Sequence, residues 1–131
     1  MGLPFLLTIP KTYSTMVEKL KVIKMQNYIS EYFSNPQNLI HPEFPMRNKI
    51  VCKDGFTMSV QASQTHYSHP RVDFAPYYFE YEVGYPSEVE DLLLPYSANP
   101  TKSPTNTVYG YVPAEVINQV IEKHWGILVE D

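Results

Sequence analysis

Two stretches of the chain alternate strictly between apolar and polar residues. The apolar positions of the first stretch are Phe56, Met58, Val60 and Ala62. A period of two is typical of a strand that buries one face and exposes the other. The Asp54-Gly55 pair before this stretch supplies the backbone freedom that a tight turn needs. The pattern therefore predicts a β-hairpin over 49–62.

The second alternating stretch runs from Tyr77 to Val83 and predicts another strand. Its apolar positions are Tyr77, Phe79, Tyr81 and Val83, with Tyr78, Glu80 and Glu82 between them. A shorter apolar segment, from Val108 to Val112, predicts a further strand. Short strands with turn residues between them are typical of an antiparallel sheet.

Apolar residues recur at helical spacing near both ends of the chain. From Thr15 to Phe33 this spacing predicts a helix, with Thr15 and Glu18 as a capping box. Asn35-Pro36 should end it. A second helix is predicted after Pro113, with Gly126 placed to cap it. The residues that this last helix should bury are Val116, Ile117, Val120 and Ile121.

Together these elements predict an α+β fold, a small antiparallel sheet with an N-terminal helix and a C-terminal helix. A chain of 131 residues normally forms one domain, so we expect a single domain over 1–131. Within it, 1–48 would form an N-terminal arm and helix, and 49–131 a ligand-binding core. Ser87 followed by Glu90 predicts one more short helix, through Leu92 to Leu94.

Composition and charge narrow the range of partners. The apolar run from Leu3 to Ile9 is too short to span a bilayer and has no basic leader, so we expect no membrane partner and interpret it as an edge strand or an arm on a neighbouring subunit. A net charge of −4 argues against a nucleic-acid polymer as partner, because neutralising phosphates needs clustered Lys and Arg. The single cysteine, Cys52, fits a small buried side chain in a reducing cytosol.

Two histidines in a polar segment raise the question of metal binding or catalysis. His66 and His69 have no third ligand at a convincing spacing, so we expect no metal site. His66-Tyr67-Ser68 matches one half of a His-x-Ser/Thr phosphoesterase signature, and that chemistry needs two such motifs. We therefore expect no catalytic residues and no enzyme. A small nucleotide phosphoesterase centred on His66 and Ser68 is kept as an alternative.

The segment from Gln61 to Tyr85 is the most informative part of the chain and indicates a ligand-binding surface. It places Arg71, one of only two arginines, beside a strand rich in tyrosine. A guanidinium group can hold a phosphate by two parallel hydrogen bonds, and a tyrosine ring can stack on a base. The alternative is a surface arginine paired with Glu80 or Glu82. No phosphate loop or dinucleotide fingerprint is present, and no cofactor is expected.

Several short motifs are similar to those of small proteins encoded by bacteriophages and prophages. They are Val60-Gln61-Ala62-Ser63, Tyr67-Ser68-His69-Pro70-Arg71, Glu82-Val83-Gly84-Tyr85-Pro86-Ser87, Pro104-Thr105-Asn106-Thr107-Val108-Tyr109 and Tyr111-Val112-Pro113. Within that group, and over roughly Lys49 to Gly126, the chain resembles the first described family of Thoeris anti-defence proteins. Members of that family are phage sponges that capture the cyclic ADP-ribose isomer made by a host defence enzyme.

The resemblance implies five ligand-binding positions in this chain. Arg71 would hold a phosphate, Tyr96 would stack on the base, and Asn106 would make a polar side-chain contact. Lys123, with His124 beside it, would supply a second basic contact from the last helix. Tyr96 and Lys123 stand where the family pattern has phenylalanine and arginine, and a lysine lacks the fork that binds phosphate with two hydrogen bonds.

The resemblance further implies sequestration of a cyclic ADP-ribose-type nucleotide, without cleavage, in the host bacterial cytoplasm. So small a domain has difficulty enclosing a dinucleotide-sized ligand alone, so we expect a homo-oligomer with the site at a subunit interface. Direct inhibition of a host or defence protein through the tyrosine-rich strand is the second hypothesis.

Overall fold

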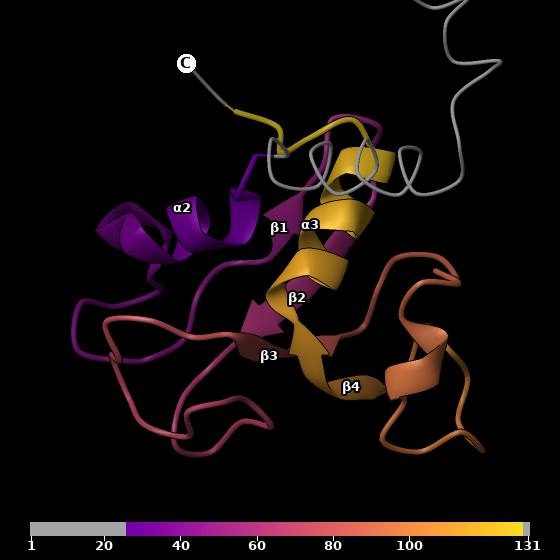
Figure 1. The fold of residues 1–131 in the computed structure, drawn as a ribbon. Coiled ribbons are helices and arrows are strands. Elements are labelled where there is room, and N and C mark those ends of the chain that lie inside the picture. The colour runs from indigo at the N-terminus through magenta and orange to yellow at the C-terminus, as the bar shows by residue number, and fades with distance from the viewer. Residues whose placement is uncertain (1–25, 130–131) are drawn as a thin grey trace, which may run out of the picture.

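The computed structural model describes residues 26–129, which form helices packed on one sheet (Figure 1). The elements in chain order are α2 (Tyr28–Ser34), η2 (Pro36–Asn38), β1 (Ile50–Val51), β2 (Thr57–Gln61), β3 (Glu80–Gly84), η3 (Leu94–Tyr96), β4 (Val108–Pro113) and α3 (Ala114–Lys123), where η denotes a 3-10 helix. The predicted α+β class is confirmed. Between residues 26 and 129, no helix has the length and apolar character needed to cross a membrane. The apolar run Leu3 to Ile9 lies outside the described residues.

The four strands form one antiparallel sheet in which sequence neighbours pair, in the order β1-β2-β3-β4. The predicted hairpin is confirmed, with Ile50 opposite Met58. Its turn needs Gly55, whose φ of +96° is strained for any residue with a Cβ atom. Asp54 Oδ1 accepts a hydrogen bond from the Phe56 amide at 2.9 Å. This turn and the long loop 62–79 therefore lie at opposite ends of β2.

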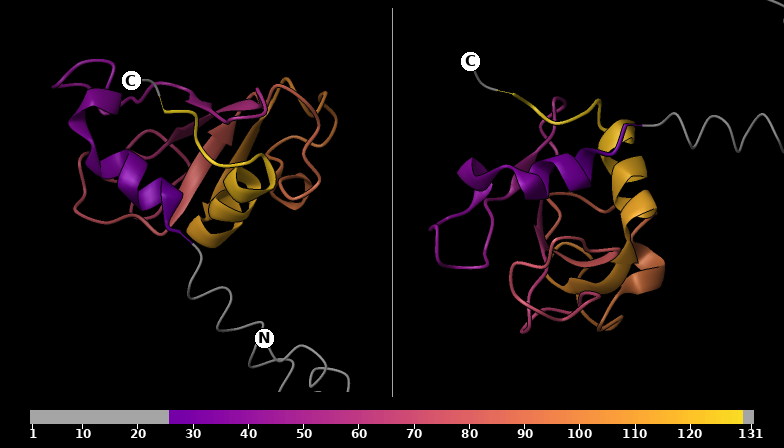
Figure 2. Two further views of the ribbon diagram at one scale, coloured as in Figure 1. Left: turned by 90° about the horizontal axis from the view of Figure 1, so that it is seen from above. Right: turned by 60° about the vertical axis from the view of Figure 1, so that its left-hand side comes forward.

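The core lies between the sheet and the two helices, which occupy the same side of the sheet (Figure 2). The alternating positions of the hairpin strand are buried as predicted; they are Phe56, Met58, Val60 and Ala62. α3 buries Ile117, Val120 and Ile121, whereas Val116 is only half-buried. β3 and β4 contribute Tyr81, Val83, Tyr109 and Val112.

The helix α2 begins later than predicted. Asn27 is not helical, and its side chain accepts a hydrogen bond from the Ser30 amide at 3.3 Å, which caps the helix. One continuous helix from Thr15 to Phe33 is therefore wrong, and the predicted capping box lies outside the described residues. The predicted end is right, because Asn35 ends α2 and Pro36 begins η2.

Buried Asn118 of α3 fixes α2 to the core. Its Oδ1 accepts a hydrogen bond from the Ile29 amide at 2.9 Å, and its Nδ2 donates to Asn27 Oδ1 at 3.0 Å. Ile29 is fully buried. The described part of the N-terminal region, 26–48, therefore shares one core with 49–129.

The alternation predicted over Tyr77 to Val83 holds only from Glu80 onward, where β3 begins. Tyr78 is buried, whereas Tyr77 and Phe79 are exposed. The reason is a tertiary contact: the Tyr78 ring packs edge-on against Phe33 of α2 at 5.8 Å, and its hydroxyl donates to Val72 O at 2.6 Å. Tyr78, which the alternation assigned to the solvent-exposed face, therefore closes the loop 62–79.

The short helix predicted through Leu92 to Leu94 is also wrong. Ser87 Oγ accepts a hydrogen bond from the Thr57 amide of β2 at 2.9 Å, so it serves the sheet and not a helix start. The chain instead forms the 3-10 turn η3, with Pro95 inside it. Glu90 is buried and bonds to residues of α3.

Gly126 helps to end α3, as predicted, together with Trp125. Gly126 N donates to Ile121 O at 2.9 Å and Trp125 N to Glu122 O at 3.1 Å, the two bonds of a Schellman turn. Trp125, with φ of +76°, takes the first left-handed position, and Gly126 follows at +90°. Pro113 lies one residue before the helix and not at its first position.

Candidate functional site

An exposed aromatic surface covers the loop 62–79 and the neighbouring part of β4. We call it the aromatic platform; its residues are Tyr67, His69, Arg71, Tyr77, Phe79 and Tyr111. The Tyr67 and Tyr111 rings stack at 5.8 Å between centroids. Phe79 stacks with His69 at 4.8 Å and with Tyr77 at 6.3 Å. All four of the tyrosine and phenylalanine rings are exposed.

Tyr67 is fixed by hydrogen bonds to two strands. Its amide donates to Glu82 Oε1 of β3 at 2.9 Å, and its carbonyl accepts the Tyr111 amide of β4 at 2.9 Å. Tyr111 lies at a bulge where the register between β3 and β4 shifts, and its φ is +53°. A bulge turns a side chain away from its regular direction, and a bulky residue at positive φ is unusual and often marks a functional position. The backbones that carry the two rings are therefore held side by side before any ligand arrives.

Gly110 allows the loop to approach β4 closely. A Cβ atom at this position would lie 3.1 Å from Tyr67 Cβ and 3.3 Å from Tyr67 Cδ2. We expect Gly110→Ala to displace Tyr67 and to destabilise the fold by about 1–3 kcal/mol, the usual cost of overpacking. Urea unfolding and the tyrosine NMR shifts measure the two effects. Gly84→Ala is the matched control, because its nearest contact is an ordinary one, 3.4 Å to a valine side chain. Equal behaviour of the two variants would contradict the close approach.

Arg71 lies on the platform without an acidic partner. Its Nη2 donates to Gln64 O at 3.4 Å, and its guanidinium carbon lies 5.6 Å from the centre of the Tyr67 ring. The alternative pairing with Glu80 or Glu82 is not observed: Glu82 accepts the Tyr67 amide, and Glu80 lies 3.8 Å from His69 Nδ1. Among residues 26–129, no carboxylate lies within ion-pair distance of Arg71.

The residues of the phosphoesterase alternative form a local structural network. Ser63 Oγ lies 2.6 Å from His66 Nδ1, and Ser68 Oγ bonds to the backbone of Ser63 and Pro70 at 3.2 Å. Both serines are fully buried. A nucleophile must reach the substrate. The geometry therefore gives no support to His66 and Ser68 as a catalytic pair.

Tyr96 and Asn106 lie on one loop region, away from Arg71. Tyr96 ends η3 and is half-buried against the core. Ala98 N donates to Val108 O at 2.9 Å, which brings the residues after Tyr96 beside the start of β4. Asn106 is exposed, and its amide donates to Ser103 O at 2.9 Å. The structure therefore brings the segments that follow Tyr96 and Asn106 beside each other.

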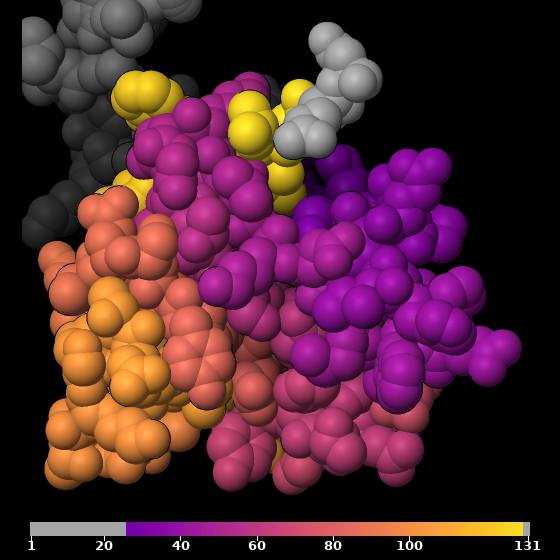
Figure 3. Space-filling view, turned by 180° about the vertical axis from the view of Figure 1, so that it is seen from behind, coloured from indigo at the N-terminus to yellow at the C-terminus, as the bar shows by residue number. Residues whose placement is uncertain are grey.

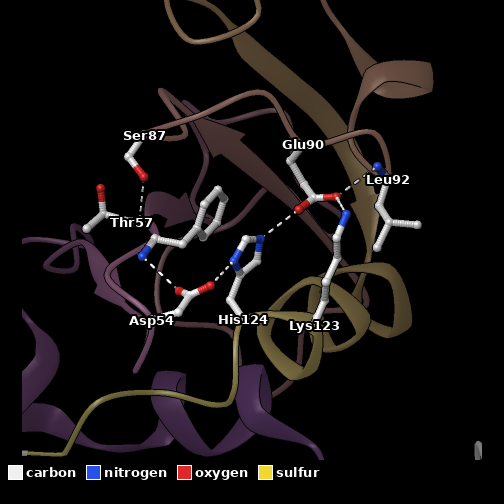
Figure 4. Close-up of polar contacts among 8 residues, drawn as sticks. Asp54, Thr57, Ser87, Glu90, Leu92, Lys123 and His124 are labelled. Carbon is white, nitrogen blue, oxygen red and sulfur yellow. Dashed lines mark hydrogen bonds and ion pairs between the residues drawn. The ribbon is translucent and has the colours of Figure 1, made fainter.

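Lys123 and His124 belong to an ion network at the end of α3, in which Glu90 and His124 are buried (Figure 4). His124 Nδ1 lies 2.6 Å from Asp54 Oδ2, and its Nε2 lies 2.8 Å from Glu90 Oε1. Lys123 Nζ donates to Glu90 Oε2 at 2.8 Å. The ring of Phe56 stacks on the imidazole at 4.0 Å. We call Asp54, Glu90, Lys123 and His124 the ion network.

The electrostatics of the ion network favour a doubly protonated His124. Burial lowers the pKa of His124, but hydrogen bonds to Glu90 and Asp54 outweigh it and raise the pKa above its ordinary 6.5. Burial raises the pKa of Glu90, but bonds from Lys123, His124 and the Leu92 amide lower it overall, below 4.5. Both nitrogens of His124 are thus committed to carboxylates, which leaves this side chain no free polar atom for a ligand.

The network predicts a stability maximum on the acidic side of neutrality. A raised histidine pKa stabilises the fold fully below the ordinary value of 6.5, and this contribution is lost as the pH rises through the folded-state pKa. The lowered pKa of Glu90 acts in the opposite sense, with stability lost as the pH falls below about 4.5. We expect the unfolding free energy to be highest between these values and His124→Gln to remove the decline on the alkaline side. Urea unfolding from pH 4 to 9 measures both profiles, and an identical alkaline decline in the variant would contradict the assignment.

The five predicted residues do not form one site within a single chain. Arg71 lies in the loop 62–79, and the ion network lies at the opposite end of β2 (Figure 1). Within residues 26–129, no group of three His, Cys, Asp or Glu side chains is arranged to hold a metal ion. The sequence interpretation missed Tyr67 and Tyr111 as a pair, because the bulge that joins them has no sequence signature. It also missed Glu90 and Asp54 as partners of His124, because Glu90 stands beside two other acids, Glu88 and Asp91, and Asp54 lies in a turn.

Comparisons with models of known protein families, with curated proteins and with solved structures found no match to this chain.

Proposed function

We propose that the protein binds a small phosphate-bearing nucleotide and withholds it from solution without cleaving it. The ligand that the sequence resemblance favours is a cyclic ADP-ribose immune signal, and the protein would then be a phage anti-defence sponge that acts in the host bacterial cytoplasm. Such a protein needs a binding surface with tight, preformed contacts and needs no nucleophile.

The observation that carries the proposal is the group Arg71, Tyr67 and Tyr111. The guanidinium has no acidic partner among the described residues, and it lies over one ring of a stacked pair. A cation beside exposed rings suits a phosphate next to a base. The backbone bonds from Glu82 and Tyr111 fix Tyr67, so little conformational entropy is lost on binding.

One platform is too small to account for the affinity a sponge needs. Nanomolar binding corresponds to about −12 kcal/mol. A stacked base contributes roughly 1–3 kcal/mol, and each charge-assisted bond to a phosphate roughly 1.5–3 kcal/mol. We propose that a second copy of the chain completes the site with Tyr96, Asn106 and Lys123. The ammonium group of Lys123 is half-exposed and uses one of its three donors on Glu90, so it can still bind a phosphate.

The test is recovery of the ligand after binding. The purified full chain is incubated with cyclic ADP-ribose isomers, separated from free ligand and then heated to unfold it. We expect intact ligand in the supernatant, in stoichiometric amount. Recovery of a cleaved product would overturn sequestration, and no retained ligand would overturn the ligand class.

The exposed stack of Tyr77, Phe79 and His69 favours a second candidate, direct inhibition of a host or defence protein. Tyr77 is 62% exposed and Phe79 is 45% exposed. Exposed aromatic rings on a rigid support are typical of protein interfaces. This candidate predicts a stable complex in co-purification that Tyr77→Ala weakens and Arg71→Ala does not. It also predicts no thermal shift with any cyclic nucleotide.

A further inference from the structure

Arg47, the arginine outside the aromatic platform, lines a cavity beside the loop 62–79. The cavity has a volume of about 260 Å³ and lies between α2, Arg47 and the residues around Tyr77. Figure 3 shows the rear face of the molecule, where the loop 62–79 (pink) lies beside the segment 36–48 (purple). The lining residues are Ser30, Phe33, Ser34, Arg47, Ala75, Pro76, Tyr77, Tyr78 and Tyr81.

Arg47 is buried and its charged group is not satisfied. The residue is 6% exposed, and its Nε and Nη1 atoms are inaccessible to water with no hydrogen-bond partner. The guanidinium carbon lies 3.8 Å from the centre of the Phe33 ring. Among residues 26–129, no carboxylate forms an ion pair with it.

The hydroxyl groups of Tyr78 and Tyr81, two residues of the cavity wall, bond to the backbone and not to Arg47. Tyr78 donates its hydroxyl to Val72 O at 2.6 Å and accepts the Ala75 amide at 3.0 Å. Tyr81 donates to Tyr78 O at 3.2 Å. These bonds fix the two rings as walls, and they leave the guanidinium with only the face of Phe33.

The backbone of Arg47 is held in place by a side chain of the sheet. Gln61 Oε1 accepts the Arg47 amide at 2.8 Å, and Gln61 Nε2 donates to Arg47 O at 2.8 Å. Leu39 forms a further bridge to Arg47 across the segment. These backbone bonds hold the Arg47 backbone beside the sheet, and from this position its side chain is enclosed.

A buried charge without a counter-charge is costly, and one cation–π contact offsets only part of that cost. Burial lowers the pKa of Arg47, because it disfavours the charged form of the guanidinium relative to the neutral form. An anion in the cavity would remove it. Since the lining holds one cation and no acid, a singly charged oxyanion would balance the charge.

We propose that this cavity binds a singly charged oxyanion, a carboxylate or a phosphodiester, carried by a small molecule with an apolar or aromatic body. The oxyanion meets the guanidinium group of Arg47, a residue that lines the cavity, and the body lies against Tyr77, Tyr78 and Tyr81. The exposed Tyr77 lies at the mouth, where a ring could stack on it. The site stands on Arg47 and does not require the function proposed above.

Two probes distinguish a carboxylate from a phosphodiester as the bound anion. Benzoate carries a carboxylate on a ring, and 3′,5′-cyclic AMP carries a phosphodiester; inorganic phosphate, a dianion near neutral pH, is the comparison. We expect one ring-bearing probe to raise the unfolding temperature of the full chain in a saturable way, with inorganic phosphate much weaker. Arg47→Met should weaken that probe roughly tenfold or more, the usual effect of removing charge-assisted bonds. Lys102→Met removes an exposed positive charge outside the cavity; it is the matched control and should leave the affinity unchanged.

An NMR measurement on the native chain keeps the test independent of how well the variant folds. The protein has two arginines, so its spectrum holds two arginine Nε–H signals, and Arg71→Met leaves only the signal of Arg47. We expect that signal to move on titration with the bound probe. The proposal requires this shift, together with loss of binding in Arg47→Met wherever that variant folds and retention in Lys102→Met. Any other pattern, including no response to either ring-bearing probe, overturns it.

Discussion

Glu90→Gln is expected to destabilise the protein by about 3–5 kcal/mol at pH 6, the cost of removing one partner of a buried ion pair. The Glu90 side chain is 1% exposed and bonds to Lys123, His124 and the Leu92 amide. A glutamine amide carries no charge, so the protonated, buried His124 keeps only the partly exposed Asp54 as counter-charge. Loss of the histidine proton removes the need for the second carboxylate, so the effect should become smaller as the pH rises.

Urea unfolding at pH 6 and pH 8 measures this prediction. Glu88→Gln is the matched control, because it makes the same charge change at an exposed position two residues away. Exposed substitutions of this kind usually change stability by less than about 0.5 kcal/mol. A similar small loss in both variants would show that the ion network adds nothing to the fold.

Arg71→Ala is expected to weaken nucleotide binding about 10- to 100-fold, while the stability of the free protein stays close to that of the parent. The loss corresponds to removing charge-assisted bonds to a phosphate, at roughly 1.5–3 kcal/mol. Stability should hardly change, because Arg71 is exposed and its one hydrogen bond, to Gln64 O, is long at 3.4 Å.

Isothermal titration with a cyclic ADP-ribose isomer measures the affinity, and urea unfolding measures the stability. Arg71→Lys tests the geometry, since lysine keeps the charge and loses the planar fork; its affinity should lie between those of the parent and the alanine variant. Lys102→Ala removes an exposed positive charge from the loop after η3 and serves as the control. Equal weakening by Lys102→Ala and Arg71→Ala would indicate a general charge effect and contradict a phosphate contact at Arg71.

The local rules of the sequence predicted the elements that depend on neighbouring residues. Alternation placed β2 and identified the four buried apolar side chains of 56–62, and Asp54-Gly55 placed the turn before it. Helical spacing and Gly126 placed α3 and its end. These features are determined by periodicity and by backbone freedom, which contacts elsewhere in the fold need not decide.

The same rules failed where a long-range contact selected the residue to bury. Tyr78 is buried in place of its neighbours because Phe33 and the carbonyl of Val72 receive it. Ser87 bonds to β2 and does not start a helix. In both cases a residue distant in sequence, Phe33 for Tyr78 and Thr57 for Ser87, decided the role of the side chain.

The candidate sites divide in the same way. The sequence by itself determined that Arg71 lies in a loop between two strands, because the turn and strand signals around it are local. Only the tertiary structure decided that Tyr111 stacks on Tyr67, that His124 has both nitrogens on carboxylates, and that Arg47 is buried without a counter-charge. The physical reason is that charge balance and ring stacking depend on atoms brought together by packing, and no spacing along the chain records them.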